Sequence, residues 1–343
     1  PVPQRVFPPW AVPALLLLPS VLCPPSWPLD ALPLAIELAA ARMHLMSPAS
    51  LHTRLANRFR LLKRPKQQGS ARHQTLLAAL DWSWDLLEPW EQAALAQCSV
   101  FHGGFDWEAV EAVIDLSPWP HAPWPVDVVA ELVERSLVMV QEDKAGLGRL
   151  SLLASVSEYA RNKLAEVEEL AAPKTGLRHA KYYAQFGNIE YIESLKRAGG
   201  VLRAWRLHGE LENLLAAVNV ASACDDGDTA ATCAIAVSCV LLKHGPFSKA
   251  VTTLNLLSSL HMTASTEGRY LYYLGWSLKL CGQIDQSKDA YERSLVIARE
   301  AGNTRGESIT LAALSTLIRD QGDVDVEVSL KLLQDALEIA QSN

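Results

Sequence analysis

The sequence lacks the short motifs by which many enzymes hold metals or phosphates. Its six Cys and nine His include no Cys-x-x-Cys and no His-x-x-x-His spacing, so we predict no metal site. Gly is nowhere followed by Lys, so no P-loop is present to cradle a phosphate. Ser83 lacks the flanking glycines of a nucleophile elbow, and the acids Asp81, Asp85 and Glu88 have no His or Cys beside them. We therefore predict no catalytic residues and a protein that is not an enzyme.

Charge and long apolar runs are also limited. The net charge is −7, with 20% charged and 49% hydrophobic residues, which is typical of a globular chain with a sizeable core. The apolar run Ala14–Leu18 is too short to cross a bilayer, and Pro13 and Pro19 bracket it, which argues against a signal peptide. Cysteines without a framework pattern fit a reducing compartment. We expect a cytoplasmic protein with no membrane partner.

Proline is concentrated at the start of the sequence. Ten of the 19 Pro fall within residues 1–33, a density that excludes a regular helix or a central strand. We predict that residues 1–30 are disordered or not native to the protein. The first residue, Pro1, also suggests a fragment.

The charge changes sign along the chain. Residues 42–72 contain eight Lys or Arg and no acid, whereas residues 81–170 contain 17 acids and five bases. A helical region is predicted over 31–70. The basic stretch 42–72 is either a nucleic-acid surface or a solvated face that docks on an acidic neighbour. We favour the second interpretation.

Residues 71–165 show the order of a winged helix. Helical patterns are followed by two β-prone runs and a last helix, over residues 76–87, 90–98, 106–114, 127–135, 136–140, 149–152 and 155–165. The helix that such a unit places in the major groove offers only Arg135 against Asp127, Glu131 and Glu134. DNA phosphates would repel these acids, so we expect the unit to contact protein and do not expect it to bind DNA directly.

Residues 166–343 are predicted to be helical. His179 begins one expected helix, and Gly245-Pro246 forms the turn of a degenerate helix pair over 228–262. Two further pairs repeat an offset of 40 to 42 residues, longer than the roughly 34 of tetratricopeptide repeats. The repeated positions are Leu274-Gly275, Leu278, Gly282, Tyr291 and Leu295, then Leu314-Ser315, Ile318, Gly322, Leu333 and Leu337. Stacked pairs of this kind make an α-solenoid. In each pair Gly282 or Gly322 ends the first helix, and the small residue Gly275 or Ser315 lets the second helix pack close to the first.

Aromatic residues near position 273 are the candidate binding site of these repeats. Tyr270, Tyr273 and Trp276 are the predicted partner-binding residues, because a solenoid presents a surface to a protein, a peptide or a small inducer. The alternative is that they, with Tyr272, only fill the core.

Several segments together resemble one family, the signal-transducing NTPases of the STAND class (AP-ATPases, NB-ARC-like), and within it the bacterial AfsR/MalT-type transcriptional regulators. The resemblance covers residues 31–343. It is carried by Ala31-Leu32-Pro33-Leu34-Ala35, Asp81-Trp82-Ser83-Trp84-Asp85, Phe101-His102-Gly103-Gly104-Phe105, Leu132-Val133-Glu134-Arg135-Ser136-Leu137-Val138 and Glu210-Leu211-Glu212-Asn213-Leu214. It implies a mainly α fold: a small helical region, a winged helix with a short β-hairpin, and tetratricopeptide-like repeats. It also implies an ATP-switched regulator.

The chain departs from this family at its nucleotide site. The P-loop domain is missing, Ala31 replaces the motif Gly, and Leu152–Ala154 stands where relatives place a nucleotide-sensing His or acid. Pro33, which would lie against the adenine, is then a vestigial cofactor contact. We expect no cofactor in this chain, with ATP or ADP only in a full-length relative, as in a truncated or frameshifted gene product. The predicted function is a regulatory protein-interaction module; the alternative is a nucleic-acid-binding regulator that uses the basic stretch 42–72.

Overall fold

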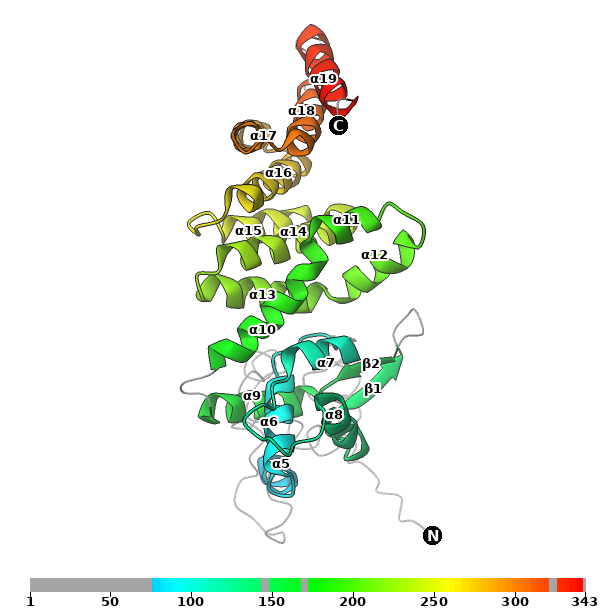
Figure 1. The fold of residues 1–343 in the computed structure, drawn as a ribbon, viewed down its shortest axis with the longest axis vertical. Helices are drawn as coiled ribbons and strands as arrows, with labels where there is room; N and C mark the ends of the chain where they lie inside the picture. The colour runs from blue at the N-terminus through cyan, green and yellow to red at the C-terminus, as the bar shows by residue number, and fades with distance from the viewer. Residues whose placement is uncertain (1–75, 143–147, 168–171, 321–325, 342–343) are drawn as a thin grey trace, which may run out of the picture. The chain divides into compact units, whose positions relative to one another are not determined.

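The structure is a computed structural model that describes residues 76–142, 148–167, 172–320 and 326–341 (Figure 1). The predicted Pro-rich start over 1–30 and helical region over 31–70, with Pro33 and the basic stretch 42–72, lie outside the described residues. The described residues fall into two compact units. One contains residues 76–100, 106–142 and 148–167, and the other contains Phe101–Phe105 and residues 172–341.

The first unit has the predicted order of helices followed by a hairpin. Its elements are α5 (Leu76–Asp85), α6 (Pro89–Cys98), α7 (Trp107–Val113), α8 (Pro125–Glu134), β1 (Met139–Glu142), β2 (Gly148–Ser151) and α9 (Ala154–Val167). The strands are antiparallel, with Val140 opposite Leu150. Helix α6 packs against α8 and α9 around a core that includes Leu95, Leu132 and Leu150. This arrangement is a winged helix, as predicted.

Helix starts in this unit are set by side chains that satisfy free backbone N–H groups. Asp106 caps α7 as predicted, because its carboxylate accepts from the Ala109 N–H at 2.8 Å. At the start of α6 the Glu91 carboxylate accepts from the Glu88 N–H at 2.8 Å, as in a capping box. Both helices therefore begin where a side-chain acceptor is available.

The first strand of the wing begins later than the sequence predicts. We expected a strand over Ser136–Val140, but β1 covers Met139–Glu142. Ser136 has a left-handed φ of 60°, and the N–H groups of Leu137 and Val138 both donate to the Leu132 carbonyl. These residues are therefore used to end α8, and pairing starts only after them.

The second unit consists of helices stacked one after another (Figure 1). They are α10 (Ala172–Ala184), the 3-10 turn η3 (Gln185–Gly187), α11 (Ile189–Ser194), α12 (Gly200–Gly209), α13 (Leu211–Ala223), α14 (Gly227–His244), α15 (Phe247–Asn255), α16 (Ala264–Leu280), α17 (Ile284–Glu300), α18 (Thr304–Asp320) and α19 (Val326–Gln341). The prediction that a helix begins at His179 is wrong. Helix α10 begins at Ala172, because Pro173 occupies its first turn, where a missing N–H costs nothing.

The predicted helix pairs are confirmed. Gly245-Pro246 is the turn between α14 and α15, and α16 and α18 begin 40 residues apart. Gly282 follows α16 with a φ of 75°, the left-handed conformation that ends a helix. The corresponding Gly322 lies outside the described residues.

Small residues bring the paired helices together. A Cβ on Gly275 would lie 2.8 Å from the Tyr291 ring, so the absence of a side chain lets α17 lie against α16. In the next pair Ser315 takes this position, and its hydroxyl lies 2.9 Å from both the Ser329 carbonyl and the Ser329 hydroxyl. Each pair thus uses a short side chain at its closest approach.

We expect Gly275→Ala to lower the free energy of unfolding by about 1–3 kcal/mol, because the new methyl group would overlap the Tyr291 ring. Gly268→Ala, in the same helix, is the matched control. Its Cβ would meet Ile297 at an ordinary 3.4 Å, so the helix should gain about 0.5–1 kcal/mol. Urea denaturation of both variants checks this; equal effects would show that the close approach is not a constraint.

Candidate functional site

Helix α8 presents an acidic face. Asp127, Glu131 and Glu134 are all exposed on it, while Val128 and Leu132 are buried beneath. The Glu88 and Glu108 carboxylates of the same unit are exposed as well. The helix that a winged helix offers to a major groove therefore carries negative charge towards solvent.

Arg135, which directly follows α8, forms an ion pair with the buried Glu91. Arg135 Nη2 lies 3.0 Å from Glu91 Oε1, and the Glu91 side chain is completely buried. A hydrogen bond with Glu91 raises the pKa of the Glu131 carboxyl. Arg135 is thus held by a carboxylate that has no solvent to screen it, which leaves this cation less available to a phosphate.

The acids that suggested an enzyme do not form a reactive cluster. Asp81 accepts a hydrogen bond from the Tyr159 hydroxyl at 2.8 Å, which joins α5 to α9, while Asp85 and Glu88 are exposed. Burial raises the pKa of the Cys98 thiol to about 12 and that of Cys239 to about 11, so both are protonated at neutral pH. Among the described residues no group of three or more His, Cys, Asp or Glu could hold a metal ion.

A buried amide is the centre of a polar network in the second unit. Asn213 Oδ1 accepts from the His102 N–H at 2.7 Å, and its Nδ2 donates to the Gly104 carbonyl at 2.7 Å and to Glu210 Oε2 at 2.9 Å. His179 Nε2 lies 3.3 Å from the same Oδ1. All the polar capacity of this amide is used, so Phe101–Phe105 is held against α10 and α13.

His179 in this network is a neutral imidazole. Burial lowers its pKa to about 4, although the hydrogen bond with Asn213 opposes the shift. Its ring also lies against Phe101 and Tyr183, at centroid distances of 5.5 and 4.6 Å. Protonation would place an unscreened charge among aromatic rings.

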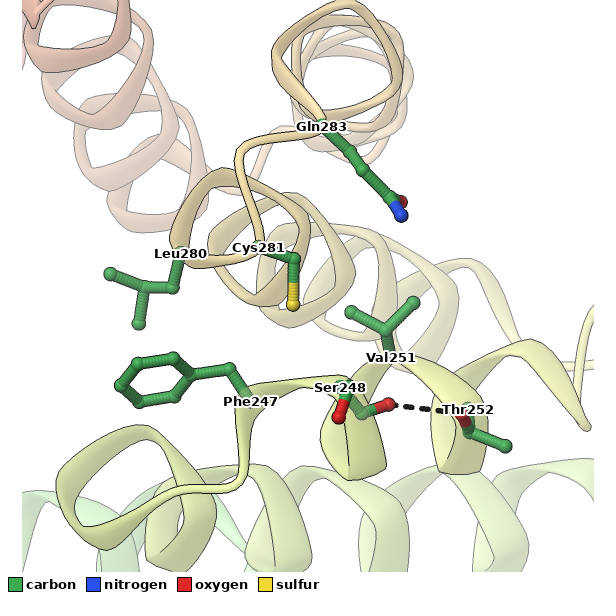
Figure 2. Close-up of a pocket in the computed structure, with 7 residues that line it drawn as sticks. All are labelled: Phe247, Ser248, Val251, Thr252, Leu280, Cys281 and Gln283. Carbon is green, nitrogen blue, oxygen red and sulfur yellow. Dashed lines mark hydrogen bonds between the residues drawn. The ribbon is translucent and has the colours of Figure 1, made fainter.

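An open groove of about 540 Å³ lies between α15 and the turn from α16 to α17 (Figure 2). Phe247 and Leu280 form its mouth, with 37% and 40% of their areas exposed, and the Cys281 sulfur points towards α15. Its other lining residues are Ser248, Val251, Thr252 and Gln283. The groove can take an apolar side chain with a polar group beside it.

The structure separates the three predicted partner-binding aromatics. Tyr270 is buried and its hydroxyl donates to the Leu254 carbonyl at 3.3 Å, which favours the core alternative for this residue. The Tyr273 hydroxyl hydrogen-bonds with the Cys239 thiol. Trp276 is 39% exposed, stacks on Tyr273, and lies one helical turn before Leu280. Of the three, Trp276 is the one whose side chain is exposed.

Sequence reasoning missed Phe247 and Leu280. Neither residue belongs to the repeated positions or to a motif, so nothing in the sequence around them indicates a groove between α15 and α16. The available signal was their position: Phe247 directly follows the predicted turn, and Leu280 lies two residues before Gly282, the predicted end of a helix. Apolar residues at adjoining helix ends are where a groove between repeats can form.

Comparison with known proteins supports the reading of the first unit. Residues 87–165 match a family model described as a winged helix-turn-helix domain. A Mycobacterium tuberculosis protein named as an HTH-type transcriptional regulator is 41% identical over 158 residues, which is 45% of this chain and 17% of the relative. An uncharacterized protein of the same organism is 39% identical over 144 residues, or 42% of this chain and 36% of that protein. The chain thus spans less than a fifth of the first relative's length.

One solved structure also matches the chain. It is the Pyrococcus horikoshii STAND protein with a tetratricopeptide repeat sensor, which matches 91% of this chain and 54% of its own at 14% identity and a TM-score of 0.31. A score this low does not establish a common fold.

The winged-helix match weakens the prediction that the chain does not bind DNA directly, because winged-helix domains often bind DNA. No helix in the described segments is both long and apolar enough to span a membrane.

The depressed pKa of His179 gives a direction for pH dependence. The unfolded chain takes up a proton near pH 6.5 and the folded chain only near pH 4, so stability is complete above pH 6.5 and falls as the pH is lowered. We expect the loss to reach about 3 kcal/mol by pH 4. His179→Gln keeps a donor for Asn213 but cannot titrate. Between pH 7 and pH 4 the unfolding free energy of this variant, measured in urea, should fall by about 3 kcal/mol less than that of the wild type. Equal losses in the two proteins would contradict the low pKa of His179.

Proposed function

We propose that the chain is part of a transcriptional regulator and that its helical repeats bind a peptide segment of a partner protein. The groove between Phe247 and Leu280 carries this proposal, because it exposes apolar side chains beside a hollow that polar side chains also line. The similarity to a protein named as a transcriptional regulator supports the regulatory context. We propose membership of the STAND class on the motifs quoted above, with no nucleotide held by this chain.

The groove suits one anchoring side chain of the peptide. Phe247 and Leu280 face one another across the mouth, and Val251 lies at its floor (Figure 2). Ser248 and Gln283 supply polar groups at the sides, and the Thr252 hydroxyl is already used on the Ser248 carbonyl at 2.9 Å. A leucine or aromatic anchor flanked by polar backbone fits this lining better than a charged inducer.

The groove contains its own reporter, the free thiol of Cys281. Peptides selected from a random phage-displayed library on the full chain should carry an apolar anchor and should slow alkylation of Cys281 by N-ethylmaleimide. The exposed Cys224 serves as the internal control and should react at an unchanged rate. Leu280→Ser should weaken the selected peptides about tenfold or more, since it removes an anchor contact.

Val296→Ser is the matched control for that variant, because Val296 is an exposed apolar residue on α17 that does not line the groove. It should leave peptide affinity within twofold. Peptides that bind Leu280→Ser as well as the wild type, or that leave Cys281 as reactive as before, would exclude the groove as the binding site.

The second candidate function is nucleic-acid binding, which the winged-helix match favours. The acidic face of α8 opposes entry into the major groove, so such binding would use the eight cations of residues 42–72. We expect the full chain to show no salt-dependent fluorescence anisotropy change with a 30-base-pair duplex. Binding that weakens from 50 to 200 mM KCl, and that Arg54→Gln with Arg58→Gln reduces, would establish the second function instead. Neutralising Asp127, Glu131 and Glu134 distinguishes the two candidate DNA-binding surfaces. DNA affinity should change if α8 lies at the interface, and it should stay the same if the basic stretch alone makes the contact.

A further inference from the structure

Helix α12 exposes its most apolar residues. Val201, Leu202 and Trp205 have 71%, 68% and 54% of their areas exposed, and they lie on one side of the helix. The opposite side carries the buried Gly200 and Leu207. A contiguous apolar surface of this kind usually marks an interaction site.

Besides the buried Leu207, two arginines attach this helix to the fold. Arg203 donates through Nη2 to the carbonyls of Ser194 and Ala198, both at 2.6 Å, and through Nε to Ser194 at 3.1 Å. The Arg206 guanidinium lies 5.8 Å from the centroid of the Phe186 ring. The Tyr191 hydroxyl donates to the Arg203 carbonyl at 3.0 Å. These contacts position α12 without using Val201, Leu202 or Trp205.

The charge around this surface is positive. Residues 195–209 contain four Lys or Arg and no acid, in a chain whose net charge is −7. Lys196 and Arg197 are exposed at the start of α12, and at its other end the His208 ring lies 5.2 Å from that of His244. The nearby Glu193 carboxylate is already in contact with Arg197 and Arg305. The surface therefore complements an apolar partner with negative charge.

We propose that the outward face of α12 is a second docking surface, separate from the groove, and that it binds an acidic amphipathic helix of a partner protein. The apolar side of that helix covers Val201, Leu202 and Trp205, and its acids lie against Lys196 and Arg197. A second copy of this chain fits less well, because a two-fold contact would bring the basic rims of both copies together. Lys196 and Arg197 could also attract lipid headgroups, so binding to anionic vesicles is one of the outcomes that the test below distinguishes.

The test uses the full chain and a designed, fluorescein-labelled 18-residue helix with Leu at i, i+3, i+4 and i+7 and Glu at most other positions. We expect anisotropy to show binding that Trp205→Ala weakens by about tenfold or more, because Trp205 is the central anchor. Leu202→Ser should weaken it in the same way. Lys196→Glu with Arg197→Glu should reduce both the affinity and its dependence on salt. Circular dichroism of each variant monitors the fold.

The controls distinguish this surface from the groove. Trp276→Ala, an exposed aromatic residue of α16, should leave binding of the designed helix within twofold, and a scrambled peptide of the same composition should bind at least tenfold more weakly. Equal binding of the scramble, no binding at all, or full binding by Trp205→Ala would each overturn the proposal. It would also be overturned if Trp205→Ala abolished self-association in sedimentation, or binding to anionic phosphatidylglycerol vesicles, in place of peptide binding.

Discussion

The second unit depends on one fully satisfied buried amide. Asn213 is completely buried and bonds to two backbone groups of the Phe101–Phe105 segment, to Glu210 on its own helix, and to His179 on α10. A buried amide that lost any of these partners would carry a desolvation cost of about 1–3 kcal/mol, so the four groups constrain one another. The stacked Phe101 and Phe105 rings, 4.1 Å apart, enclose the network in apolar surface. The position of α10 against α13 follows from this set of bonds.

Much of the fold could be predicted from the sequence because its signals are local. The Asp106 cap, the Gly245-Pro246 turn and the 40-residue repeat each depend on neighbours a few positions away or on a simple periodicity. The two errors also have local causes that compete with the pattern. Ser136 takes a left-handed conformation that delays β1, and Pro173 lies in the first turn of α10, so that this helix begins at Ala172, upstream of the predicted start at His179.

The candidate sites could be predicted only in part. The exposure of Trp276 could be predicted, because an aromatic residue beyond the apolar stripe of a helix has to face elsewhere, but its binding role stays a prediction. The groove depends on how α15 and α16 meet, and the Asn213 bonds join residues 109 and 111 positions apart, so neither leaves a mark in a short window of sequence. The apolar face of α12 was missed for a different reason. Its Arg residues point inward, which reverses the usual rule that apolar residues predict the buried side.

That reversal separates two roles that a single helix usually combines. The residues that attach α12 to the fold are Arg203, Arg206 and Leu207, and the residues that face solvent take no part in the attachment. Substitutions on the outer side therefore carry a small thermodynamic penalty, since more than half of each of these side chains is exposed. Related chains can diverge freely at positions 201, 202 and 205 while keeping the same backbone, so binding preferences at this surface can evolve faster than the scaffold that presents them.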